Sequence, residues 1–142
     1  MMDTILDLGL NDDSVLGLAK ATGQERNAWD SYRRPVQMYG TTVLGVDGAY
    51  FATALDQARA TVGASTDLDL GTADLHRLTG VFQAIVRGQS GRDFPQDPLE
   101  QLRGAVRAVF DSWLGERARI HRRREGIPDD LGTAVNVQAR PP

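Results

Sequence analysis

Apolar residues recur at every third and fourth position over most of this chain, and only the stretch 133–138 alternates with a period of two. Spacing of three and four places side chains on one face of a helix, whereas alternation places them on one face of a strand. Residues 133–138 (TAVNVQ) are therefore the only predicted strand. A lone strand leaves its amides and carbonyls without a ladder. We expect a mainly α fold with one C-terminal β-strand whose partners lie outside the chain; the alternative is a short edge extension with no partner.

Six helices are predicted from apolar spacing and from residues that start or stop helices. They cover residues 14–22, about 24–44, 49–62, 73–88, 98–114 and 116–125. The clearest start is Asp97-Pro98-Leu99-Glu100, which combines an N-cap acid, a proline in the first turn and a glutamate in capping-box position. Thr72 is expected to cap the fourth helix. Gly23 and Gly126 are the predicted stops of the first and last helices.

Pro35 lies inside the second predicted helix. It has no amide hydrogen to donate, and its ring crowds the preceding turn. We therefore expect that helix to kink or break near Arg33 and Arg34.

Length and composition restrict the class of protein. The 142 residues suit one domain, and the absence of cysteine excludes disulfides, thiolate zinc sites and a cysteine nucleophile. The formal charge of −3 does not indicate a nucleic-acid partner. No apolar run reaches the length of a membrane span, and no signal-peptide pattern opens the chain. The sequence predicts a cytoplasmic protein with neither membrane nor nucleic acid as partner.

The residues do not form a recognisable active site. The sequence contains no phosphate-binding loop of the G-x-x-x-x-G-K-[ST] type, no G-x-G-x-x-G and no G-x-S-x-G. His76 and His121 lack a second ligand at helical spacing, and His76 is expected on a helix surface. We therefore predict no catalytic residue and no metal site within the chain.

Arginines provide the clearest charge feature, in the segment 117–124 and at Arg33-Arg34. Arg33, Arg34, Arg122 and Arg123 are candidate contacts to a phosphate or to a partner. The competing interpretation of the segment 117–124 is a solvated helix end whose cations interact with the helix dipole. For Arg33 and Arg34, ion pairs with Asp30 at helical spacing are a sufficient explanation.

Five blocks of the sequence together resemble pyruvate phosphate dikinase. They are MMDTILDLGLND, TGQERNAWDSYRRPVQMYG, FPQDPLEQL, AVFDSWLGERARIHRRREGIP and DDLGTAVNVQ. The resemblance implies that residues 1–142 are part of the N-terminal nucleotide-binding domain, a helical subdomain of an ATP-grasp-like fold truncated at both ends.

The resemblance also implies a parent reaction. Enzymes of that family interconvert ATP, pyruvate and phosphate with AMP, phosphoenolpyruvate and diphosphate through a phosphohistidine, using ATP and Mg²⁺. The family's threonine-serine-histidine run is absent, and neither His76 nor His121 matches it. Only Asp3 and Thr4 match family positions near the nucleotide. We therefore expect the isolated chain to be inactive and to bind neither ATP nor Mg²⁺ tightly.

Three departures from the family pattern indicate that the gene is altered or split. Pro35 replaces an aromatic residue, His121 replaces a tyrosine, and Arg140-Pro141-Pro142 follows where the family continues along a strand. A frameshift, a decayed gene or a split enzyme is expected, and in the split case the rest of the dikinase is a separate partner chain. The alternative is a non-enzymatic helical module that binds a partner through Arg117–Arg124. The oligomeric state is not specified by the sequence.

Overall fold

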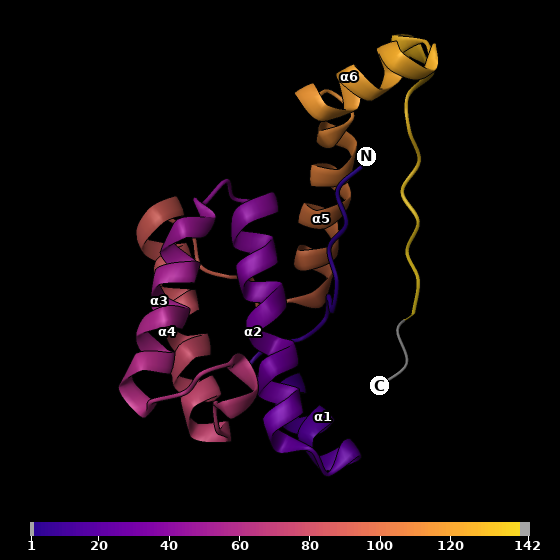
Figure 1. Ribbon diagram of the computed structural model, residues 1–142. Coiled ribbons are helices and arrows are strands. Elements are labelled where there is room, and N and C mark those ends of the chain that lie inside the picture. Colours follow the sequence, from indigo (N-terminus) through magenta and orange to yellow (C-terminus); the bar gives the residue numbers. More distant parts are fainter. Residues whose placement is uncertain (1, 140–142) are drawn as a thin grey trace.

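The computed structural model describes residues 2–139, which form six α-helices and two short 3-10 turns (Figure 1). The helices are α1 (Ser14–Thr22), α2 (Glu25–Thr42), α3 (Gly48–Val62), α4 (Thr72–Ser90), α5 (Pro98–Ser112) and α6 (Glu116–Glu125). The 3-10 turns are η1 (Asp67–Asp69) and η2 (Asp129–Leu131). Helices α1 to α4 pack together, α5 lies along one side of them, and α6 lies beyond the C-terminal end of α5 (Figure 1). The mainly helical prediction is confirmed.

The start and stop signals of the sequence operate largely as expected. Gly23 and Gly126 end α1 and α6 in the left-handed conformation, which glycine adopts without a steric penalty. The Asp97 carboxylate accepts a hydrogen bond from the Leu99 amide at the start of α5, at 3.0 Å. Thr72 is the first residue of α4 rather than its cap, so that detail of the prediction is wrong. Gly71 is the cap, and its amide donates to the Asp74 carboxylate.

Helix α2 continues through Pro35, so the predicted break is wrong. Proline removes the one hydrogen bond that its own amide would have made, and its ring crowds the preceding turn. Pro35 is fully buried, and Tyr32 and Val36 on either side of it have no exposed surface. The packing of this apolar face against the rest of the bundle outweighs the missing backbone bond.

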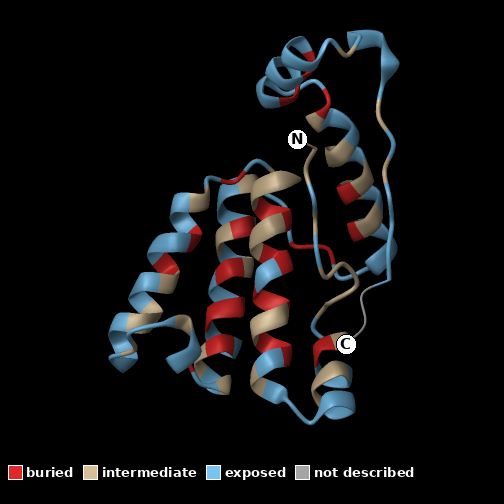
Figure 2. Cartoon of the chain, turned by 45° about the vertical axis from the view of Figure 1, so that its right-hand side comes forward, coloured by how far each residue is buried: buried red, intermediate tan, exposed pale blue. Residues whose placement is uncertain are grey.

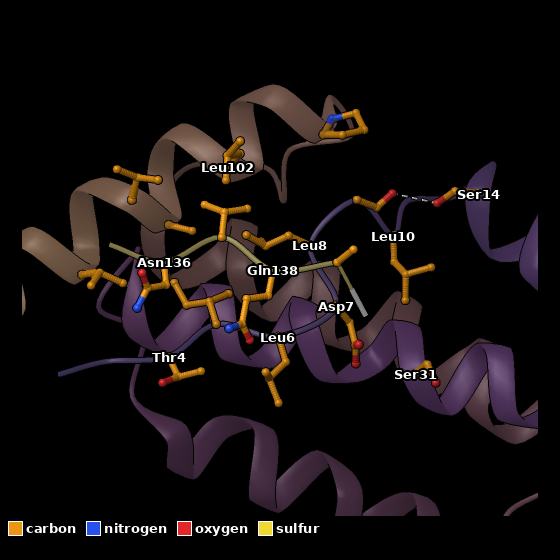
Figure 3. A pocket seen from close by; sticks show the side chains of 18 of the residues that line it. Thr4, Leu6, Asp7, Leu8, Leu10, Ser14, Ser31, Leu102, Asn136 and Gln138 are labelled. Atoms are coloured by element: carbon orange, nitrogen blue, oxygen red, sulfur yellow. Dashed lines mark hydrogen bonds between the residues drawn. The ribbon is translucent and has the colours of Figure 1, made fainter. Parts of the chain in front are cut away.

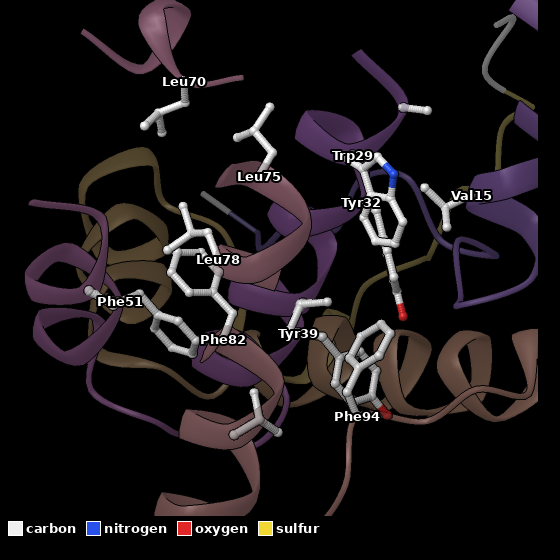
Figure 4. Packing of buried hydrophobic residues seen from close by; sticks show 14 of the residues in the cluster. Val15, Trp29, Tyr32, Tyr39, Phe51, Leu70, Leu75, Leu78, Phe82 and Phe94 are labelled. Carbon is white, nitrogen blue, oxygen red and sulfur yellow. The ribbon is translucent and has the colours of Figure 1, made fainter. Parts of the chain in front are cut away.

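The core lies among α1, α2, α3 and α4 and the loop that carries Phe94 (Figure 4). Phe51 of α3 meets Phe82 of α4 edge to face, with ring centroids 5.0 Å apart. Gly40 makes this packing possible, because a Cβ there would lie 2.9 Å from the Phe51 ring and 3.0 Å from Val86. The absence of a side chain at one position thus lets α2, α3 and α4 approach one another closely.

Residues 133–138 do not form a strand, and the part of the chain that the structure describes contains no β-ladder. The segment runs extended beside α5 (Figure 1), and Val137 is 68% exposed. The predicted C-terminal strand is therefore not found in the described chain. Its alternation favours a strand, but ladder hydrogen bonds require a second strand, and none lies within residues 2–139.

None of the helices in the described range has an apolar stretch long enough to cross a membrane.

Candidate functional site

An open groove of about 1390 Å³ lies beside α5, and we call it the α5 groove (Figure 3). One wall is the N-terminal segment 2–10, and another is the extended segment 134–139, which we call the tail. The floor includes the apolar side of α5 and parts of α1 and α2. The apolar side chains that line the groove include Leu6, Leu8, Leu10, Leu102, Val106, Val109, Val135 and Val137.

The N-terminal wall is held to α5 by side-chain hydrogen bonds at both of its ends. The Asp3 amide donates to the Ser112 hydroxyl at 3.3 Å, and the Gly9 amide donates to the Gln101 side-chain oxygen at 2.8 Å. The Gln101 side-chain nitrogen in turn donates to the carbonyls of Leu10 and Pro95, at 3.0 and 2.7 Å. Gln101 has no exposed surface. The segment therefore runs antiparallel to α5 in a fixed register.

Helix α5 leaves much of its apolar stripe uncovered within the described chain. Only Gln101 and Ala105 of this helix are buried, whereas Leu99 is 59% and Phe110 is 47% exposed (Figure 2). An amphipathic helix of a globular protein normally packs such a stripe against a core. Exposed apolar residues on one helix face are a feature of interaction surfaces.

Asp3 and Thr4, the residues that the resemblance places near a nucleotide, both line the α5 groove. Asp3 faces Arg117 of α6, with 3.8 Å between carboxylate and guanidinium. The lining includes the carboxylates of Asp3 and Asp7 and, within the described residues, neither lysine nor arginine. Binding of a triphosphate requires cationic or densely packed amide donors. Among the described residues, the lining of the groove offers no cationic partner for a phosphate.

Arg33 and Arg34 form the ion pairs with Asp30 that the sequence allowed as the alternative to phosphate contacts. Arg33 is buried, and its guanidinium contacts Asp30 at 2.8 Å and Asp67 of η1 at 3.0 Å. Arg34 is exposed and lies 2.6 Å from the other oxygen of Asp30. Arg33 therefore ties η1 to α2 and is not accessible to a ligand in this conformation.

The arginines of α6 separate into one buried and several exposed side chains. Arg122 is 2% exposed and contacts Asp129 and Trp113. Arg123 is exposed, as are Arg117, Arg119 and Arg124. Arg122 is therefore not available to a partner on the surface of α6, and a basic binding surface there would consist of the exposed arginines only.

Both histidines lie on helix surfaces. His76 is exposed and its ring lies on Trp29, with centroids 4.2 Å apart, which confirms its prediction as a helix-surface residue. His121 is also exposed. No group of three or more metal-ligating side chains occurs among residues 2–139.

Sequence reasoning missed Gln101, the buried residue that positions the N-terminal wall. Helical spacing could have indicated its burial. Gln101 precedes Ala105 by four residues and so lies on the same face of α5 as the buried alanine. An uncharged polar residue at a core position needs hydrogen-bond partners, and loops that lack secondary structure supply them.

Comparison with known proteins gives a consistent result. No protein-family model matches the chain. The chain is 50% identical over 139 residues to pyruvate, phosphate dikinase of Clostridium symbiosum, and 47% identical to those of Rhizobium meliloti and Giardia intestinalis. These alignments cover 97–98% of the chain but only 16% of each relative. Over nearly its whole length, the chain is therefore homologous to one segment of the pyruvate, phosphate dikinase family.

Proposed function

We propose that this chain is the helical part of a dikinase nucleotide-binding region and acts only when assembled with the remaining parts of such an enzyme. The observation that carries the proposal is the α5 groove. There, a partly uncovered apolar helix face lies opposite a tail that makes no backbone hydrogen bonds to other described residues. In the assembled enzyme, the chain supplies a wall of the ATP site rather than the reacting groups. The parent reaction would interconvert pyruvate and phosphoenolpyruvate at the expense of ATP.

The proposed inactivity of the isolated chain follows from charge. Phosphoryl transfer is catalysed mainly by positioning and by neutralising the charge on the phosphates. The lining of the α5 groove carries Asp3 and Asp7 and lacks a cationic side chain among the described residues. ATP and Mg²⁺ would therefore be held by residues from the rest of the enzyme, with Asp3 and Thr4 close to the nucleotide.

The tail would become a strand in that assembly. Thr133 and Val135 are half-buried while the residues between and after them are exposed, which is the alternation of a strand with one covered face. Addition of a neighbouring strand would satisfy its backbone groups, as in other cases of strand addition. The same neighbour would cover the apolar stripe of α5 and complete an ATP-grasp-like domain.

A chimeric enzyme tests the proposal directly. The segment of the Clostridium symbiosum dikinase that matches this chain would be replaced by the corresponding 139 residues. We expect the chimera to consume ATP in a pyruvate- and phosphate-dependent manner within about tenfold of the parent rate, which corresponds to a small change in activation free energy. The isolated chain, assayed in parallel, should show no such activity.

Two results would contradict the proposal. One is a chimera that folds and assembles like the parent but has no dikinase activity. The other is pyruvate- and phosphate-dependent ATP consumption by the purified chain alone.

A further inference from the structure

The buried side chain of Arg122 holds the turn between α6 and the tail against the end of α5. The guanidinium of Arg122 donates from Nε to the Asp129 carboxylate at 2.7 Å and from Nη1 to the Trp113 carbonyl at 2.6 Å. Its central carbon also lies 4.1 Å from the centre of the Trp113 ring. Arg122 thus contacts the end of α5 and the start of η2 at the same time.

Two further hydrogen bonds close the same turn. The Trp113 indole nitrogen donates to the Asp129 carbonyl at 3.2 Å, and the Ile127 amide donates to the Arg122 carbonyl at 2.9 Å. Residues 113, 122 and 129 therefore form a three-part cluster, which we call the latch. Beyond η2, the tail extends back beside α5 toward its N-terminal end (Figure 1).

Arginine suits this position for a physical reason. A guanidinium offers five donors in a planar fork and stacks on an aromatic ring, so it can bond two acceptors while covering the indole. A buried cation that lost one acceptor would be left unpaired in a poorly solvated place, which is strongly unfavourable. The latch is therefore stable only when η2 lies against Trp113.

We propose that Arg122 is a positioning residue whose contacts with Asp129 and Trp113 fix the direction in which the tail leaves α6, and so set one wall of the α5 groove. The tail has no backbone hydrogen bonds to other elements within the described chain. Its placement beside α5 consequently depends on the turn that precedes it. This inference does not depend on the proposed function, because it concerns the isolated chain.

The test measures a distance within the chain. The sequence contains no cysteine, so Arg103→Cys on α5 and Gln138→Cys on the tail, both exposed, provide unique sites for two nitroxide labels. Pulsed electron paramagnetic resonance then gives the distribution of distances between α5 and the tail. The labelled chain with the latch intact should give one narrow peak.

Three variants in the labelled background decide the outcome. Arg122→Gln should lose the narrow peak, and Asp129→Asn should broaden it, because the neutral amide that replaces the exposed carboxylate pairs more weakly with the buried guanidinium. Arg123→Gln, an exposed neighbour on the same helix, should leave the peak unchanged. Circular dichroism establishes that each variant keeps its helices, and Asp129→Asn decides the question if Arg122→Gln unfolds. A narrow, unchanged peak in the folded Arg122 or Asp129 variants would overturn the proposal.

Discussion

Buried polar side chains hold several segments outside the α-helices in place. Gln101 holds the N-terminal wall, Arg33 holds η1, and Arg122 holds the turn after α6. No buried side-chain nitrogen or oxygen of the described residues lacks a hydrogen-bond partner. Each of these side chains therefore fixes a segment that has no ladder or helix of its own.

Replacement of Gln101 by leucine should destabilise the chain. The variant keeps the volume but leaves the Gly9 amide and the Leu10 and Pro95 carbonyls without their partner. Buried groups left unsatisfied cost about 1–3 kcal/mol each. Because the Gly9 amide and the Leu10 carbonyl are only partly buried, we expect the free energy of unfolding in urea to fall by about 2–4 kcal/mol in total. Gln57→Leu on the exposed side of α3 is the control and should change it by less than about 0.5 kcal/mol. Equal effects of the two substitutions would contradict this role.

Acid should weaken the chain through Asp129. The hydrogen bond and charge of Arg122 lower the pKa of the Asp129 carboxyl below its ordinary value. A carboxyl whose pKa is lower in the folded state contributes stability above its unfolded pKa of about 3.9, and this contribution is lost as the pH falls through the folded value. The urea midpoint of the wild-type chain should therefore decline below about pH 4.

The Asp129→Asn variant isolates that contribution. Its urea midpoint should decline less steeply over the same pH range, because the titrating group is gone. Some decline should persist, since hydrogen bonds from Thr66 lower the pKa of Asp69 in a separate loop. Identical pH profiles for the two proteins would contradict the assignment.

At the scale of elements, close packing of α5 on α2 depends on Gly104. A Cβ at this position would lie 2.1 Å from the Tyr39 hydroxyl oxygen, so Gly104→Ala must displace the ring or the helix. Overpacking of this kind typically costs about 1–3 kcal/mol, which outweighs the better helix propensity of alanine. We expect a lower melting temperature in a calorimetric scan.

Gly80→Ala in α4 is the matched control. No atom lies within 4 Å of the Cβ that it would add, so only the propensity gain of about 1 kcal/mol remains. That variant should melt higher than the wild type. The interpretation fails if Gly104→Ala is also stabilised.

The helices could be predicted from the sequence, whereas the strand and the sites could not. Helices α1, α5 and α6 begin or end at local signals such as Gly23, Asp97 and Gly126, because helix hydrogen bonds lie within the element. A strand requires a second strand with which to form hydrogen bonds. The alternation at 133–138 favours a strand, but the described residues provide no such partner. The role of Arg122 was equally hidden, since burial depends on the long-range contact between α6 and the end of α5.

At the scale of the whole molecule, stability should be distributed unevenly. The main core contains residues of α1, α2, α3 and α4 and none from α5 or α6. The principal helix contact of α5 is α2. Segments with few buried apolar contacts open at lower free energy than the core.

Hydrogen exchange should therefore divide the chain into two parts. Amides in the middle of α2 and α4 should exchange slowest, those of α5 and α6 faster, and those of the tail fastest. Mass spectrometry of peptides after timed deuterium labelling measures this order. Protection of α6 equal to that of α4 would show that the two parts open together.

The placement of the two extended segments also has a mechanical consequence. Residues 2–10 and 134–139 run in the same direction along α5. The first segment is held by side-chain hydrogen bonds to α5, and the second by the latch that precedes it. Tension applied through these segments would first stretch the hydrogen bond between Asp3 and Ser112, those of Gln101, and the latch. These anchors would yield before the helical bundle deformed. Helices α1 to α4 would then move as a rigid body, connected through the two flexible extended segments. They could change their orientation without unfolding.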